Sequence, residues 1–201
     1  MRMSAKHKIG ILGGSFDPVH KAHIGLANAA CTKLGLDKIV FVPAHQAPLR
    51  DAPTLTPDSH RIAMLRLSLE SFPFPWEICD YEIRKGGTGY SIDTAKYLQS
   101  CEDAEYFWII GSDHLSKLSK WKDIEELSKL ATFVCAPREG FGFPISEAPK
   151  CAKIIPLDFG PLPDSSTFIR GARSLEQLHL MLDKPVAAYI LKNKLYGFAD
   201  T

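Results

Sequence analysis

Long apolar runs are missing from this chain of 201 residues, and its charge is nearly balanced. No stretch approaches the roughly 20 consecutive apolar residues of a membrane-spanning helix, so we expect no membrane association. The formal net charge is only +1. The sequence therefore lacks the strong positive field with which many proteins bind nucleic acids, and we expect no nucleic-acid partner. Any recognition of an anion must be local.

Cysteine is scarce and scattered, with five residues in all and no Cys-x-x-Cys pair. This pattern argues against a disulfide framework and against a structural zinc site, so we expect reduced and mostly buried thiols. Internal repeats, low-complexity tracts, interdomain linkers and a signal-type N-terminal segment are also missing. With 45% hydrophobic residues, the sequence predicts one domain over residues 1–201 and a cytoplasmic location.

Apolar segments of strand length alternate with segments of helical periodicity. The predicted strands cover residues 8–12, 38–42, 76–84, 105–111, 131–136 and 152–157. The predicted helices cover residues 24–35, 58–71, 92–99, 123–130 and 185–196, and Asp58 or Ser59 is the expected N-cap of the second. Continuous apolar runs such as Ile39–Val42 suit strands of a parallel sheet that is covered on both faces. Only the strand at 76–84 alternates, which is typical of an edge strand.

The first strand runs directly into a loop, Gly13–His23, that precedes a helix. Glycines allow close approach of the backbone to a ligand, and the free N–H groups at a helix start favour an anion. His20 and His23 are three residues apart, so both rings lie on one helical face. Each feature has an ordinary alternative, because glycine pairs often form simple turns and single histidines often lie on surfaces. Asp17-Pro18 inside the loop nevertheless indicates a shaped turn.

Polar side chains also follow the other predicted strands, where ligand sites of parallel sheets lie. Arg50 stands in a proline-rich loop at 43–57, and Arg138 follows the strand at 131–136. Asp113 follows the central strand and suits ribose hydroxyls, or else it is an N-cap. Trp121 is either a core anchor or a surface on which a ring stacks. The run Ser165–Arg170 opens a helix and suits its cap, and its hydroxyls with Arg170 would also make a second anion site.

Two of these stretches carry a family resemblance. Gly13–His23 resembles the nucleotide-binding loop of the nucleotidylyltransferase superfamily, and Ser165–Arg170 is similar to its second signature. Three further stretches resemble bacterial nicotinate-nucleotide adenylyltransferases. These are Val42-Pro43 with Pro48-Leu49-Arg50, then Gly89–Thr94, then Ile109–Leu115 through Trp121. The resemblance extends from residue 8 to about residue 197.

The resemblance implies a Rossmann-like α/β fold, a doubly wound and mainly parallel sheet with helices on both faces. It implies transfer of the adenylyl group of ATP to nicotinate mononucleotide, with His20, His23 and Arg170 as catalytic residues. The implied ATP-binding residues are Gly13, Gly14, Ser15, Phe16, His20, His23, Gly111, Asp113, Ser165, Ser166, Thr167 and Arg170. The implied acceptor-binding residues are Arg50, Tyr90, Ser91, Trp121 and Arg138. Mg²⁺ would be held mainly by the substrate phosphates, with no metal site of the protein's own, and a homo-oligomer is possible.

The chain departs from the family pattern at Ala22, Leu49, Ser91 and Glu139. Leu49 and Glu139 fall on the acceptor side, so they bear on the choice of acceptor more than on the reaction. Nicotinamide mononucleotide or pantetheine phosphate is the alternative acceptor, and Trp121 with the Tyr90-Ser91 turn argues against the latter. A nucleotide-binding module without catalysis, or an α/β domain with a purely structural role, is the alternative to an enzyme.

Overall fold

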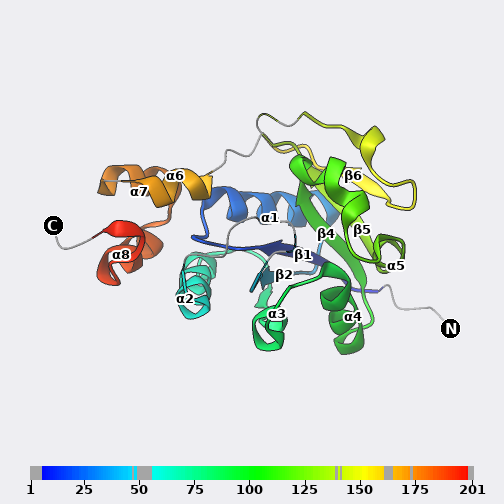
Figure 1. Cartoon of the computed structure of the whole chain (residues 1–201), viewed down its shortest axis with the longest axis horizontal. Helices are drawn as coiled ribbons and strands as arrows, with labels where there is room; N and C mark the ends of the chain where they lie inside the picture. The colour runs from blue at the N-terminus through cyan, green and yellow to red at the C-terminus, as the bar shows by residue number, and fades with distance from the viewer. Residues whose placement is uncertain are drawn as a thin grey trace.

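A computed structural model describes residues 6–46, 48, 56–138, 140, 142–160, 165–172 and 174–198 (Figure 1). Its centre is a six-stranded sheet in which every pair of neighbouring strands is parallel. The strands are β1 (Lys8–Gly14), β2 (Lys38–Pro43), β3 (Trp76–Ile78), β4 (Glu105–Gly111), β5 (Ala131–Ala136) and β6 (Ile154–Pro156). Their order is β3-β2-β1-β4-β5-β6.

Helices cover both faces of this sheet. They are α1 (Lys21–Leu34), α2 (Asp58–Leu69), α3 (Tyr81–Lys85), α4 (Ser91–Cys101), α5 (Ile124–Leu130), α6 (Ser165–Gly171), α7 (Leu175–Met181) and α8 (Lys184–Lys192). Three 3₁₀ segments are η1 (Ser112–Lys120), η2 (Ile145–Glu147) and η3 (Leu195–Gly197). Helices α6, α7 and α8 lie together at one end of the molecule (Figure 1).

Two hydrophobic cores lie on opposite faces of the sheet. Ile39 and Phe41 of β2 belong to the core that also contains buried residues of α1, α2 and α8. Val40 and Val42 of the same strand belong to the other core, which α4, η1 and α5 complete. This alternation follows from the period of two of a β-strand. The predicted Rossmann-like fold, a doubly wound parallel sheet with helices on both faces, is confirmed.

The strand order reverses between β1 and β4, which are neighbours at the centre of the sheet. Successive strands run outward from β1 on one side and from β4 on the other, so the loops that leave these two strands diverge. In doubly wound sheets this is the point where a crevice opens for ligands. The crevice here is bounded by the chain after Gly14 and the chain after Gly111.

The predicted strand at 76–84 is correct only for its first three residues. β3 pairs with β2 over Trp76–Ile78, and the chain then forms the short helix α3. Arg84 Nε donates to Asp80 Oδ1 at 2.7 Å, an i,i+4 contact that a helix allows and a strand does not. The helix at 185–196 is also shorter than predicted, because α8 ends at Lys192.

Helix α2 begins as predicted, but its N-cap is Pro57 rather than Asp58 or Ser59. The Asp58 carboxylate contacts the side chains of His45 and Arg61 instead. Helix α1 begins at Lys21, three residues before the predicted start, with His20 as its N-cap and Gly35 in the left-handed conformation at its end.

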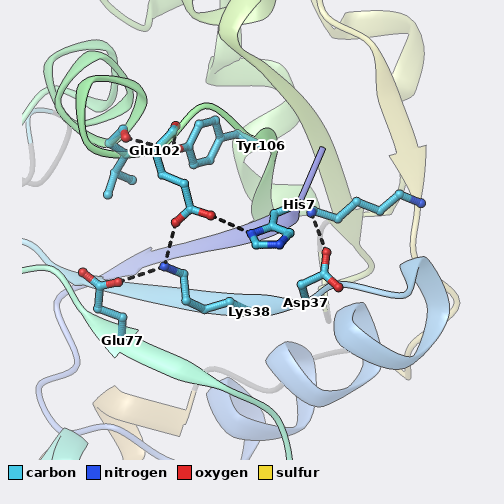
Figure 2. A network of polar contacts seen from close by, with 8 residues as sticks. His7, Asp37, Lys38, Glu77, Glu102 and Tyr106 are labelled. Atoms are coloured by element: carbon cyan, nitrogen blue, oxygen red, sulfur yellow. Dashed lines mark hydrogen bonds and ion pairs between the residues drawn. The ribbon is translucent and has the colours of Figure 1, made fainter. Parts of the chain in front are cut away.

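The amino ends of the strands carry a polar network (Figure 2). Lys38 Nζ lies between the carboxylates of Glu77 and Glu102, at 3.1 and 3.2 Å, and His7 Nδ1 contacts Glu102 at 3.0 Å. The backbone N–H of Lys8 donates to Asp37 Oδ2 at 2.8 Å. Such partly exposed pairs contribute about 1 kcal/mol or less each. They tie β1, β2, β3 and the end of α4 together on the side away from the crevice.

The cysteines match the sequence-based expectation in part. All five are free, and Cys31, Cys79 and Cys135 are buried, whereas Cys101 and Cys151 are exposed. Within the described ranges, no helix has both the length and the apolar character needed to cross a membrane. Whether residues 1–201 form one domain, as the sequence predicts, stays a prediction.

Candidate active site

A cavity of about 690 Å³ opens at the carboxyl ends of β1, β2 and β4. The predicted site residues among its lining are Gly13, Gly14, Ser15, Phe16, His20, His23, Tyr90, Ser91, Gly111, Asp113, Trp121, Arg138, Ser166, Thr167 and Arg170. Arg50, Leu49 and Glu139 lie outside the described residues, and so does the side chain of Ser165. The structure thus brings together the two signatures and most of the predicted acceptor-side residues.

The loop after β1, which we call the cradle (Gly13–His23), is held in a defined shape. Phe16 adopts a positive φ of 47°, and the peptide bond between Asp17 and Pro18 is cis. The Phe16 ring is buried and lies edge-on to the His23 ring, with their centroids 5.0 Å apart. The N–H of Ala44 donates to the Gly14 carbonyl at 2.9 Å, which attaches the cradle to the end of β2.

His20 and His23 lie face to face at the start of α1. Their ring centroids are 3.7 Å apart with an interplanar angle of 25°. The backbone N–H of His20 donates to His23 Nδ1 at 3.3 Å, so the neutral ring of His23 carries its proton on Nε2. His20 Nδ1 is buried and has no hydrogen-bond partner among the described residues. The pair therefore has unused hydrogen-bonding capacity beside the cavity.

Both histidines are neutral near pH 7. Burial, together with the nearby positive charge of Arg138, lowers the pKa of His20 to about 4. The pKa of His23 lies well below its ordinary value because the ring is buried and because His20 and Arg138 would repel a proton there. The two rings act as neutral N–H donors in the free protein, and a bound polyanion would favour their protonation.

Helix α6 docks on the far side of the cradle. Arg170 Nη1 donates to the Asp17 carbonyl at 2.9 Å, and its Nη2 donates to Thr167 Oγ1 at 3.2 Å. Ser166 Oγ donates to the Pro18 carbonyl at 3.5 Å. The hydroxyl of Tyr196 donates to Asp17 Oδ1 at 2.8 Å. The hydroxyl-rich helix start and the cradle therefore face the same cavity from two sides.

Asp113 lies across the crevice from the cradle, in η1. Its Oδ2 accepts from Arg138 Nη1 at 3.0 Å, whereas its Oδ1 is buried and has no partner among the described residues. A Cβ at Gly111 would come within 2.5 Å of this Oδ1, so a larger residue there would displace the carboxylate. Gly111 is the N-cap of η1, and the interpretation of Asp113 as an N-cap is wrong. An unpartnered carboxylate oxygen suits a ribose hydroxyl.

Trp121 belongs both to the core and to the cavity wall. Its ring makes edge contacts with Trp108, His114 and Phe133 at centroid distances of 6.5, 5.8 and 6.1 Å. Trp121 can therefore be a core anchor and at the same time offer a surface to a ring in the cavity. Tyr90, the N-cap of α4, also lines the cavity.

Several lining residues were not predicted from the sequence. These are Lys117, Lys120, Lys122, Glu82 and His114, all of which line the cavity. Lys122 Nζ lies 4.6 Å from the centroid of the Tyr90 ring, a cation–π contact. The spacing of Lys117 and Lys120 could have indicated this, because a 3₁₀ helix repeats every three residues and places both lysines on one face.

The donor set suits phosphate rather than a bare metal ion. Among the described residues, no cluster of three or more His, Cys, Asp or Glu side chains could hold a metal. Imidazole, hydroxyl and guanidinium groups instead face the cavity, and these bind phosphate oxygens.

Comparison with known proteins agrees with this geometry. A family model described as cytidylyltransferase-like matches residues 11–174. A protein of Opitutus terrae named "Probable nicotinate-nucleotide adenylyltransferase" is 44% identical over 135 residues, which are 67% of this chain and 69% of that protein. A protein of Clostridium beijerinckii with the same name is 34% identical over 94% of this chain and 98% of its own length.

One solved structure shares the fold over nearly the whole chain. Plasmodium falciparum nicotinic acid mononucleotide adenylyltransferase, complexed with NaAD, superimposes with a TM-score of 0.76. The alignment covers 96% of this chain and 98% of that one, at 19% sequence identity. At this identity the likeness concerns the fold alone, whereas the sequence relatives define the family. The chain belongs to the nicotinate-nucleotide adenylyltransferase family, within the cytidylyltransferase-like group.

Proposed function

We propose that this protein transfers the adenylyl group of ATP to nicotinate mononucleotide, releasing pyrophosphate and forming nicotinate adenine dinucleotide in NAD biosynthesis. The observation that carries the proposal is that both nucleotide signatures and an aromatic and basic acceptor side line one cavity. Sequence relatives bear the name of this activity, and the Clostridium beijerinckii relative is matched over 98% of its length.

The mechanism we propose is direct attack of the acceptor phosphate on the α-phosphorus of ATP, in line with the leaving pyrophosphate. A phosphate oxygen is already a nucleophile, so the protein has to align the reactants and stabilise the charge that spreads over the phosphates. His20 and His23 would donate from neutral rings, and Arg170 would add a fixed positive charge. Mg²⁺ bound to the ATP phosphates would supply further neutralisation.

The adenosine side of the cavity would be formed by Gly111 and Asp113. The unpartnered Oδ1 of Asp113 can accept a hydrogen bond from a ribose hydroxyl, and Gly111 leaves room for that carboxylate. The cradle, with Gly13 and the histidines, would then hold the phosphates at the end of β1. This arrangement spans the crevice between β1 and β4, as nucleotides do in doubly wound sheets.

The acceptor side favours an acidic ring substituent. Trp121 and Tyr90 offer aromatic surfaces, the cavity is also lined by three lysines, Lys117, Lys120 and Lys122, and Lys122 Nζ lies over the Tyr90 ring. A carboxylate on the pyridine ring gains from this positive potential, whereas a neutral amide gains little. This charge distribution is the specific reason for preferring nicotinate over nicotinamide mononucleotide. A cytoplasmic location and a homo-oligomer stay predictions.

A pyrophosphate-release assay with ATP and Mg²⁺ tests the proposal. Nicotinate mononucleotide, nicotinamide mononucleotide and pantetheine phosphate would be compared as acceptors at equal concentration. We expect the fastest release with nicotinate mononucleotide. Faster release with another acceptor would reassign the substrate, and no release with any acceptor would indicate a nucleotide-binding module.

A further inference from the structure

The buried face of α2 contains an arginine that the proposed mechanism does not use. The buried positions of this helix are Arg61, Met64, Leu65, Ser68 and Leu69, which have the spacing of one helical face. Arg61 is 0% exposed, although arginine is almost never fully buried without partners. A charge held at this position calls for a specific reason.

The Arg61 guanidinium joins the cradle to α2. Its Nη1 donates to the backbone carbonyl of Ser15, and its Nη2 donates to Asp58 Oδ1. The other carboxylate oxygen of Asp58 contacts His45 Nδ1 at 2.9 Å. His45 follows β2, so the Arg61–Asp58 pair of α2 contacts the cradle through Arg61 and the segment after β2 through Asp58. The planar fork of arginine can serve both acceptors at once, which a lysine ammonium does less well.

The contact at Ser15 has a consequence for the next residue. In a trans peptide, the carbonyl of Ser15 and the N–H of Phe16 point in opposite directions. Arg61 holds the carbonyl on the buried side, and Arg61 itself does not line the cavity, whereas Ser15 and Phe16 do. The N–H of Phe16 therefore points away from Arg61. Phe16 has a φ of 47°, a conformation that a non-glycine residue adopts only when its surroundings enforce it.

We propose that Arg61 is a positioning residue of the cradle: by holding the Ser15 carbonyl it presents the Phe16 N–H to a nucleotide phosphate, and Asp58 and His45 fix the guanidinium in place. The guanidinium also polarises the Ser15–Phe16 peptide, which strengthens its N–H as a donor. The identification of the phosphate as that of ATP rests on the proposed function.

The test is an Arg61→Lys variant, compared with Ser68→Ala as a matched control. Ser68 lies on the same buried face of α2 and donates to Asp183 Oδ2 at 3.0 Å, away from the cradle. Affinity for a non-hydrolysable ATP analogue with Mg²⁺ would be measured by calorimetry, and the Phe16 amide would be followed by NMR. A charge-assisted hydrogen bond corresponds to about a 10- to 100-fold change in affinity.

We expect Arg61→Lys to weaken analogue binding by about 10-fold or more and to abolish the downfield shift of the Phe16 amide on binding. Ser68→Ala should lower the melting temperature but keep wild-type affinity and the amide shift. Wild-type affinity in a folded Arg61→Lys protein would overturn the proposal. Equal loss of affinity in both variants would do so as well, because it would show a general effect of instability.

A second variant covers the case in which Arg61→Lys does not fold. Asp58→Asn keeps a hydrogen-bond acceptor for Arg61 but removes the charge, so analogue affinity should fall by about 3-fold. Unchanged affinity in Asp58→Asn would contradict the proposal. The binding assay needs no acceptor, so its outcome is separate from that of the proposed function. Wild-type protein that binds the analogue but releases no pyrophosphate would refute only the latter.

Discussion

The stacked histidines of the cradle predict a specific acid sensitivity of the fold. In the unfolded chain the pKa of His20 is 6.5, and in the folded protein burial and Arg138 lower it to about 4. Between these values the unfolded state binds the proton and the folded state does not. The free energy of unfolding therefore falls as the pH falls from 6.5 to about 4, and the contribution is constant above and below this window.

The size of the effect follows from the two pKa values. Once the pH is below both values, their difference corresponds to a loss of about 3 kcal/mol in the free energy of unfolding. At pH 5, where the unfolded histidine is largely protonated and the folded one is not, the loss relative to pH 7 is about 2 kcal/mol. His23 contributes in the same direction, because its pKa is also lowered in the folded protein.

The assay is urea unfolding of wild type and of His20→Asn at pH 7 and pH 5. Asparagine keeps a polar side chain at this position but does not titrate. We expect the wild type to lose about 2 kcal/mol more than the variant between the two pH values. Ser68→Ala serves as a control that lowers stability without removing a titrating group, so its loss should parallel that of wild type. Parallel losses in wild type and His20→Asn would refute the low pKa of His20.

Three further predictions concern the reaction. His20→Ala should slow pyrophosphate release on the order of 100-fold through loss of a donor to the phosphates, and an unchanged rate in folded protein would exclude that role. Gly111→Ala should raise the KM for ATP about 10-fold or more. Its Cβ would come within 2.5 Å of Asp113 Oδ1, and KM for ATP would show whether the carboxylate has moved. Lys122→Met should reduce the preference for nicotinate over nicotinamide mononucleotide by about 2- to 5-fold. Lys96→Met, at an exposed pair with Glu126, is its control, and equal changes in both variants would contradict the assignment.

The central strands and the two nucleotide signatures were predictable because each has a recognisable local sequence pattern. Continuous apolar runs such as Ile39–Val42 identify buried parallel strands, and the glycines of the cradle stand directly after one of them. The prediction of a strand at 76–84 was wrong beyond Ile78 for a physical reason. Only Trp76–Ile78 finds a partner strand, and the helix that follows is stabilised by a contact between α3 and α4, in which Thr94 Oγ1 donates to Glu82 Oε1 at 2.8 Å. Such a tertiary contact has no counterpart in local periodicity.

The buried face of α2 also could not be predicted from local periodicity. The sequence predicts a helix at 58–71, but its apolar residues Ile62 and Leu67 are only partly buried. The face that points inward includes Arg61 and Ser68, two polar residues. Their burial depends on partners at Ser15 and Asp183, which are far away in sequence. A sequence pattern identifies such residues only when the distant acceptors are already known.

The docking of α6 and η3 on the cradle has a consequence for how the protein is made. The bonds from Arg170 and Tyr196 to Asp17 connect residues 153 and 179 positions apart. At about 5 to 20 residues per second, a ribosome needs roughly 10 to 35 seconds to deliver Tyr196 after Asp17 has been synthesised. The sheet around β1 can assemble during that interval, but the cradle stays open on one side. Competence to hold a nucleotide is therefore among the last properties that the emerging chain acquires.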